Sequence, residues 1–438
     1  MSSNLQNRKL YYFLLAFFAF AVFFFNQNHL NQDTIYIKHI LSIAENVFKG
    51  AGYTNEAGKS AFYPIWGYVF LQLPGLIVGF PHLWTLFVQF CAAIIGLVLF
   101  YKLFEIKEKY WHIPLFLPYF ALCSIKTADG LASILLIAYA YNFVAFVKTE
   151  ELRKLVYSGL VLAVLVNLRS EYLYLPLFQT LFFFICFKNR LKYAKMNAIL
   201  ITITFAAILP WAIRSYAINQ EVRFNSSNGG AVMYISLGQL PQNKWGIAPT
   251  DSTAYAIAAA NGIDDPFSPE ADKLFKRLTQ EAILNNPFEF IKKMAYNATK
   301  VFTNGVYTGE YANFFLGKSV RSEIDSKINL YQSKIEQIRY LFNLPTNRSV
   351  PLLLEKFIQM VFAPIFFSLM IYQLYTFAIR KSRQNKIIMI VGMIIIFKIL
   401  IISLIQYEYR HSTGFYLLLF GVFVYFLNNR EILNNRKN

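Results

Sequence analysis

Long apolar runs, separated by short polar segments, follow one another along almost the whole chain. Roughly ten of these runs are candidates for membrane-spanning helices, although several are shorter than the roughly 20 residues that a helix perpendicular to the bilayer needs. They lie at 11–26, 84–104, 111–126, 130–147, 155–168, 172–187, 197–213, 353–379, 387–405 and 413–428. The pattern therefore predicts an all-α, polytopic membrane protein with a bundle of roughly ten transmembrane helices.

The segment 62–80 is also apolar, but prolines and glycines interrupt it (Pro64, Gly67, Pro74, Gly75 and Gly79). If this segment only enters the membrane or lies along it, the basic groups of the chain all fall on one side, which is the pattern of cytoplasmic loops. These groups lie at 8–9, 107–109, 148–154, 188–195, 380–386 and 430–437. We therefore interpret 62–80 as re-entrant or juxtamembrane, with both termini cytoplasmic.

This topology divides the chain into three parts. An N-terminal transmembrane module covers 1–213 and includes a first outer loop at 27–83. A small, mainly helical extracytoplasmic domain covers 214–352, where turn residues at 264–268 precede a helix start and Asn286-Pro287 interrupts the following helical stretch. The C-terminal transmembrane helices cover 353–438.

Composition supports a membrane protein over a basic soluble one. Hydrophobic residues make up 56% of the chain and charged residues only 15%, below the roughly 25% of an average soluble domain. The mean hydropathy is +0.39. The net charge of +18 would suggest nucleic acid for a soluble chain. Here it fits cytoplasmic loops that face anionic lipid, so the expected partner is the lipid bilayer and not nucleic acid.

The first outer loop contains the first candidate for chemistry, Asp33. Tyr36, His39, Ile40 and Ile43 follow it at helical spacing, and predict a helix over 34–48 that ends at the glycines 50 and 52. A carboxylate at the membrane–water interface is partly desolvated. Desolvation raises the pKa of the carboxyl group, which suits it to act as a base. The alternative is that Asp33 only caps the helix.

Further charged residues fall at the same membrane level in loops that are far apart in sequence. Arginine binds phosphate in a bidentate grip and stays ionised, whereas a carboxylate can accept a proton from a hydroxyl nucleophile. Together they suit a reaction in which a lipid phosphate leaves and a hydroxyl attacks. The residues are Glu56, Lys126, Asp129, Arg169, Glu171, Arg214, Glu408, Arg410 and His411.

Each of these residues also has a structural interpretation. Asp129 could cap the fourth span, Glu171 could pair locally with Arg169, and Lys126, Arg214 and Arg410 could extend to lipid headgroups. His411 is interpreted as a hydrogen-bonded interface residue. No spacing of His, Asp, Glu or Cys predicts a metal site, and the three cysteines lie in apolar runs.

A series of short motifs occurs in a fixed order along the chain: Asp33-Thr34-Ile35-Tyr36, Gly50-Ala51-Gly52-Tyr53, 63–68, Asp129, Arg169, 210–216, 227–230, 282–288 and Glu408-Tyr409-Arg410. This order resembles the GT-C superfamily, in particular bacterial membrane transferases of the protein-mannosyltransferase and lipid A aminoarabinose-transferase type (glycosyltransferase family 39-like). Thr34 stands where that family has a second acid after the first.

The resemblance implies transfer of a sugar from a polyprenyl-phosphate-linked donor to an acceptor hydroxyl, with inversion, on the extracytoplasmic face of a bacterial inner membrane. Asp33 would be the general base, and Asp129 and Glu56 would assist it or orient the acceptor. Arg169, Arg214 and Arg410 would bind the donor phosphate. Tyr36, Tyr68 and Glu408 would bind substrate. A glycolipid, a polysaccharide or a protein remains open as the acceptor. The sequence identifies no cofactor with certainty, and a divalent cation stays open.

Two other functions compete with this interpretation. A polysaccharide polymerase or ligase would use the same phosphate grip with a lipid-linked oligosaccharide. A flippase or transporter would place ionisable residues near the bilayer midplane, often in repeated halves, and neither feature is visible in the sequence.

Cysteine labelling tests the predicted topology. Cysteines introduced at positions 70 and 230 should react with a membrane-impermeant maleimide added outside the cell. Reaction of position 230 only from the cytoplasm would reverse the proposed orientation.

Overall fold

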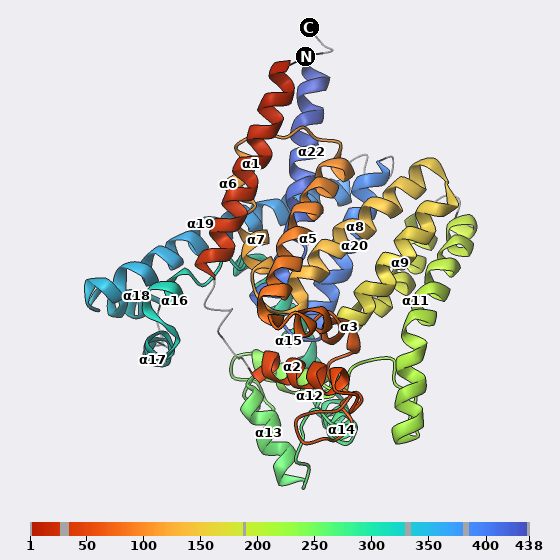
Figure 1. Ribbon diagram of the computed structural model, residues 1–438, viewed down its shortest axis with the longest axis vertical. Helices are drawn as coiled ribbons and strands as arrows, with labels where there is room; N and C mark the ends of the chain where they lie inside the picture. The colour runs from red at the N-terminus through yellow and green to blue at the C-terminus, as the bar shows by residue number, and fades with distance from the viewer. Residues whose placement is uncertain (1, 27–34, 187–189, 329–333, 380–384, 436–438) are drawn as a thin grey trace.

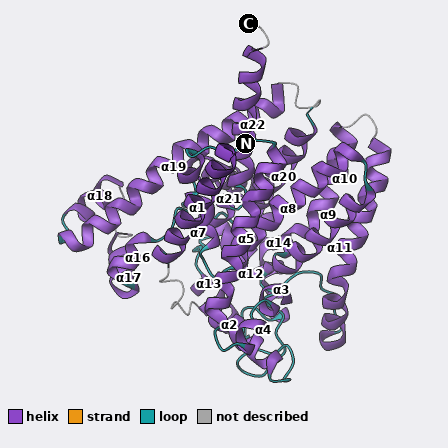
Figure 2. Cartoon of the chain, turned by 45° about the horizontal axis from the view of Figure 1, so that its top comes forward, coloured by secondary structure: helices purple, strands orange, loops and turns teal. Residues whose placement is uncertain are grey.

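The computed structural model describes residues 2–26, 35–186, 190–328, 334–379 and 385–435. Every regular element in these ranges is a helix, apart from an isolated bridge between Thr54 and Ser60 (Figure 2). The predicted all-helical class is therefore confirmed.

Within the described ranges, seven helices are long and apolar enough to cross a membrane. They confirm a polytopic helical membrane protein, although the sequence predicted roughly ten spans. The seven are α1 (Ser2–Phe25), α5 (Pro81–Phe104), α8 (Ala128–Thr149), α11 (Arg190–Asn219), α19 (Thr346–Ile379), α20 (Lys386–Leu404) and α22 (Tyr416–Asn435), whose spanning stretch starts in the short α21 (Tyr409–Thr413).

Three of the predicted spans form shorter helices. The run 111–126 breaks into α6 (His112–Leu115) and α7 (Leu117–Cys123), because Pro118 starts a new helix and does not continue the old one. The runs 155–168 and 172–187 give α9 (Leu152–Leu168), the 3-10 helix η2 (Ser170–Tyr174) and α10 (Leu175–Cys186). α9 is about 26 Å long, near the thickness of the hydrocarbon core.

The segment 62–80 does not form a continuous spanning helix. It folds into two short helices, α3 (Trp66–Phe70) and α4 (Leu73–Ile77). α3 packs against the end of α9, where a Cβ on Gly67 would lie 2.5 Å from the carbonyl oxygen of Asn167. Before it, α2 (Ile35–Phe48) is the helix predicted at 34–48, and Gly50 and Gly52 follow it with φ of 78° and 77°.

The chain between α11 and α19 builds a mainly helical region outside the bundle, which we call the outer region. Figure 1 shows α12, α13 and α14 together with α2 at the end of the bundle away from both termini, and α16, α17 and α18 at one side. The elements are α12 (Gly229–Ser236), η3 (Leu237–Gln239), α13 (Asp251–Ala260), α14 (Pro269–Asn285), α15 (Pro287–Thr303), α16 (Tyr311–Leu316), α17 (Lys318–Ile328) and α18 (Lys334–Phe342).

The predicted helix start and break in this region are both present. The Ser268 hydroxyl accepts a hydrogen bond from the Ala271 amide at 3.1 Å, and Pro269 occupies the first helical position of α14. α14 ends at Asn285 and α15 begins at Pro287, so the Asn-Pro step separates the two helices.

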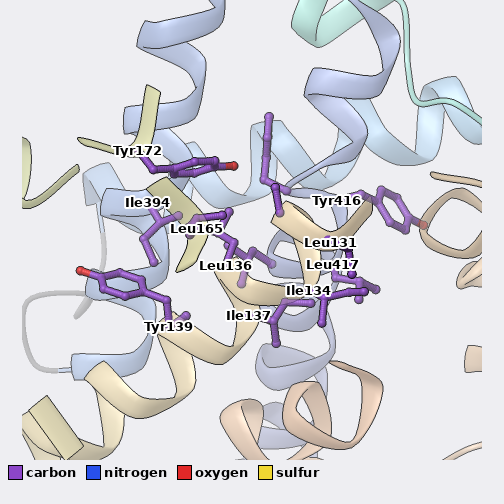
Figure 3. Close-up of a cluster of buried hydrophobic side chains, with 14 of the residues drawn as sticks. Leu131, Ile134, Leu136, Ile137, Tyr139, Leu165, Tyr172, Ile394, Tyr416 and Leu417 are labelled. Carbon is purple, nitrogen blue, oxygen red and sulfur yellow. The ribbon is translucent and has the colours of Figure 1, made fainter. Parts of the chain in front are cut away.

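α8 lies at the centre of the main core. Its Leu131, Ile134, Leu136 and Ile137 are buried among residues of α9, α20 and α22 (Figure 3). Most residues of α8 are buried and apolar, which is typical of a helix surrounded by other helices in a membrane bundle. This burial fixes the position of the N-terminus of α8, where Asp129 lies.

Gly230 provides a test of the packing in the outer region. A Cβ at this position would lie 2.5 Å from the backbone oxygen of Asp272, whereas at Gly229 the nearest atom would be 4.0 Å away. We expect Gly230→Ala to lower the free energy of unfolding of this region by about 1–3 kcal/mol because the backbone has to shift. Thermal unfolding and limited proteolysis of the purified protein measure the effect.

Gly229→Ala is the matched control and should leave both measurements nearly unchanged. Equal sensitivity of the two variants would contradict the packing described. Because Gly230 is so tightly packed, the exposed Ser252 on α13 is the better position for topology labelling.

Candidate functional site

Charged side chains from three distant segments meet where α8 begins and where α9 and α20 end. We call them the charged cluster, and its members are Asp129, Arg169, Glu171, Lys398, Glu408, Arg410 and His411. Six of them were candidates in loops predicted to lie at one membrane level, and the structure brings these together with Lys398 from within α20.

Asp129 lies at the centre of the charged cluster and bridges two arginines. Its Oδ1 is 2.7 Å from Arg169 Nη1, and its Oδ2 is 3.6 Å from Arg410 Nε. The carboxylate is in the first turn of α8, where the helix dipole favours a negative charge. Thr127 occupies the N-cap position, so Asp129 is not the cap of this helix.

Arg169 has an extended backbone because α9 ends at the residue before it. Its guanidinium therefore reaches across to α8, and its Nη2 also lies 3.2 Å from Glu171 Oε2. This contact confirms the local pair expected from the sequence, but the pair is only part of the network. A planar guanidinium that binds two carboxylates is fixed in both position and orientation.

Glu171 joins the charged cluster to the interior of α20. Its Oε1 is 2.5 Å from Lys398 Nζ, and this ammonium also lies 4.8 Å from the centre of the Tyr172 ring. Burial raises the pKa of Glu171, but the attraction of Lys398 and Arg169 outweighs it, so the pKa lies below its ordinary value. The carboxylate is therefore ionised at neutral pH.

His411 is neutral in this arrangement. Arg169 Nη2 can only donate, so His411 Nε2 accepts its hydrogen bond at 3.1 Å. The proton then belongs on Nδ1, which donates to the carbonyl of Gln406 at 3.3 Å. The ring thus supports Arg169, in agreement with its interpretation as a hydrogen-bonded interface residue.

The charged cluster is balanced in charge and graded in exposure. Three cations (Arg169, Lys398 and Arg410) face three carboxylates (Asp129, Glu171 and Glu408). The side chains of Lys398 and Asp129 are 4% and 8% exposed, whereas those of Glu408 and Arg410 are 31% and 38% exposed. A ligand therefore meets Arg410 and Glu408 first.

Arg410 and Glu408 form a close pair at this entrance. Arg410 Nε is 2.5 Å from Glu408 Oε2. Burial raises the pKa of Glu408, but the neighbouring Arg410 outweighs this effect and lowers it. An incoming phosphate would compete with Glu408 for the guanidinium.

Arg214 lies in a different environment. Its Nη1 and Nη2 donate to the carbonyls of Ala61 and Tyr53, both at 2.9 Å, and its guanidinium lies over the rings of Tyr53, Phe62 and Trp211. This arginine therefore attaches the segment around Tyr53 and Ala61 to α11. Binding of a phosphate there would have to replace these bonds.

The other predicted residues lie in the segment 27–83. Glu56 is exposed in a turn, and Tyr68 is buried, with its hydroxyl 3.2 Å from Gln89 Oε1. Tyr36 lies in α2, and the described side chains of this helix begin at Ile37. Asp33 lies outside the described residues, so its role as base stays a prediction.

Residues of the outer region hold the segment that leads into the charged cluster. Lys293 Nζ on α15 donates to the carbonyls of Leu404 and Ile405, both at 2.8 Å, at the C-terminus of α20. Gln239 donates to the Tyr407 carbonyl at 2.9 Å and accepts from the Tyr407 amide at 3.0 Å. These bonds fix the backbone directly before Glu408.

Sequence reasoning missed Lys398, Lys293 and Gln239. A signal existed for Lys398, because a single lysine inside an apolar span has to find a partner. Lys293 and Gln239 carry no such signal, since each is one polar residue among many in a polar region.

Within the described residues, no group of three or more His, Cys, Asp or Glu side chains could hold a metal ion.

No protein-family model matches the chain, and no curated protein matches it.

Removing the charge of Asp129 tests the network. Asp129→Asn leaves Arg169 and Arg410 without their shared carboxylate, and loss of one partner of a buried ion pair costs about 3–5 kcal/mol. We expect a large fall in the thermal stability of the purified protein. Glu45→Gln, in the exposed pair with Lys49, is the control and should cost less than about 1 kcal/mol. Similar small effects in both variants would show that the network does not stabilise the bundle.

Proposed function

We propose that the chain is an integral membrane glycosyltransferase that moves a sugar from a polyprenyl-phosphate-linked donor to an acceptor hydroxyl at the extracytoplasmic face. The observation that carries the proposal is the charged cluster, in which basic and acidic side chains from distant segments meet at the ends of apolar helices. Charges in such surroundings are costly, and a functional site is the usual reason to keep them.

In the proposed reaction the acceptor oxygen attacks the anomeric carbon, and the bond from this carbon to the phosphate oxygen breaks. The lipid phosphate leaves with an additional negative charge, which a fixed guanidinium stabilises in the transition state. Arg410 is the first candidate for this contact because it is the most exposed cation of the charged cluster. Arg169 lies behind it, fixed by Asp129 and Glu171.

The carboxylates of the charged cluster hold the guanidinium groups of Arg169 and Arg410 in position before the phosphate binds. A phosphate that binds Arg410 would replace Glu408 as the partner of the guanidinium. The released Glu408 carboxylate can then accept hydrogen bonds from sugar hydroxyls. This gives Glu408 the substrate-binding role expected from the resemblance.

Asp129 is a poor candidate for the general base, because its two oxygens face two arginines. We therefore keep Asp33 as the proposed base, with its proton taken from the acceptor hydroxyl, and assign Asp129 to positioning of Arg169 and Arg410. Arg214 supports the loop that carries Asp33 by holding the backbone at Tyr53 and Ala61. Inversion at the anomeric carbon follows from a single displacement.

Lys398 favours a second candidate function. A buried lysine paired with Glu171 inside a spanning helix is typical of transporters and flippases. Such a protein would move the lipid-linked sugar across the membrane without breaking the sugar–phosphate bond. A polymerase or ligase would break the same bond with a longer glycan.

Variants at Asp33 and Arg410 test the enzyme proposal. With purified protein in lipid vesicles and a polyprenyl-phosphate sugar pool from the host, Asp33→Asn should abolish glycan transfer measured by mass spectrometry. Arg410→Gln should lower turnover by about 10²–10³-fold, the cost of losing one preorganised contact to a developing negative charge. Arg277→Gln, at an exposed position of α14, is the control and should keep full turnover.

Three outcomes would contradict parts of this proposal. Turnover in Asp33→Asn would remove Asp33 from the base role. Full turnover in Arg410→Gln would remove the phosphate contact. Cell-envelope glycans that are identical with and without the protein, together with donor that crosses the vesicle membrane uncleaved, would favour the transporter.

A further inference from the structure

A cavity of about 620 Å³ lies at the end of α5 opposite the charged cluster. The N-terminal turns of α1, the C-terminal turns of α5 and the loop 105–110 form its walls. α5 is about 36 Å long, so the cavity and the charged cluster belong to opposite faces of the membrane. The distribution of basic residues predicts that the cavity faces the cytoplasm.

The walls of this cavity carry an excess of positive charge. Arg8, Lys102 and Lys107 line it, and Glu108 is the one carboxylate among its lining residues. Arg8 Nη2 lies 2.7 Å from Glu108 Oε1, so this pair is neutral. Lys102 and Lys107 form no ion pair with any described residue, which leaves two uncompensated cations at the cavity.

Tyrosine side chains complete the polar lining. Tyr12 donates a hydrogen bond to Glu108 at 2.8 Å, and Tyr110 donates to the Asn7 carbonyl at 3.3 Å. These bonds join α1 to the loop after α5 and keep the walls in place. Tyrosine at this depth is typical of the level of lipid headgroups.

An apolar path leads from the cavity into the membrane. Ile95 and Val98 lie on the same face of α5 as Lys102, at spacings of three and four residues. Val98 lines the cavity, and Ile95 is 58% exposed although it lies within the spanning helix. A molecule with an anionic head and an apolar chain matches both parts.

We propose that this cavity binds the headgroup of an anionic phospholipid, with the phosphate beside Lys102 and Lys107 and an acyl chain over Val98 and Ile95. The volume is in the range of ordinary ligand sites, and basic pockets between membrane helices on the cytoplasmic side bind anionic headgroups. The proposal does not depend on the function proposed above. The bound lipid would link α1 to α5.

Lipid retention measured by native mass spectrometry tests this proposal. The full-length protein, purified from bilayers with equal amounts of phosphatidylglycerol and phosphatidylcholine, should retain phosphatidylglycerol preferentially. The double variant Lys102→Gln/Lys107→Gln should bind it at least about tenfold more weakly, because each lysine near an anionic lipid contributes to the attraction. Both side chains are exposed, so the fold should persist.

The double variant Lys154→Gln/Lys195→Gln is the matched control, since it removes the same charge from the same predicted membrane side outside the cavity. It should retain phosphatidylglycerol like the unmodified protein. An equal loss in both double variants, or no preference between the two lipids in the unmodified protein, would overturn the proposal. Inorganic phosphate that binds as tightly as phosphatidylglycerol would overturn the lipid assignment and indicate a soluble phosphate compound. If the double variant does not fold, Lys102→Gln alone should still show a weaker preference, and an unchanged preference would overturn the proposal.

Discussion

The bond between Arg169 and Asp129 is the interaction on which the arrangement of the site depends. A guanidinium and a carboxylate could not be buried separately in an apolar bundle without a cost of several kcal/mol each. Paired at 2.7 Å, they connect the start of α8 to the end of α9. Glu171, His411 and Arg410 then attach to one or the other partner, so each further charge is compensated where it enters the cluster.

Arg169, which follows α9, and Arg214, which lies within α11, have different roles. Arg169 binds side chains and organises charge, whereas Arg214 binds backbone carbonyls and organises a loop. The aromatic rings of Tyr53, Phe62 and Trp211 shield Arg214 and replace part of its hydration. Its place in the shared motif order is therefore explained as well by loop support as by phosphate binding.

Hydrophobic patterning was sufficient for the class of the fold but not for the number of spans. Apolar residues of 111–126 predicted a membrane helix, yet this run is broken at Pro118 and is buried by other helices, including α22. Hydropathy does not distinguish burial by protein from burial by lipid. Helix ends marked by local chemistry, such as Ser268 with Pro269 or Gly50, were predictable because the signal lies within a few residues.

The candidate site could also be predicted only in part from the sequence. The predicted topology places the loops of Asp129, Arg169 and Arg410 at one face of the membrane. The sequence was therefore sufficient to predict that these three residues belong to one site. Partner choice was not predictable, since Arg214 and Arg410 look alike in sequence and differ only in the surfaces that fold against them. Lys398 could have been found from its apolar surroundings, while Gln239 and Lys293 depend on the docking of a distant helix.

The hydrogen bonds of Lys293 and Gln239 also connect the outer region directly to the transmembrane bundle. Lys293 on α15 donates hydrogen bonds to the carbonyls at the C-terminus of α20. The side chain of Gln239 forms two hydrogen bonds with the backbone of Tyr407, one to its carbonyl and one from its amide. Glu408 and Arg410 follow within three residues of that pair. A displacement of α15 would therefore be transmitted to the entrance of the charged cluster through only a few peptide units.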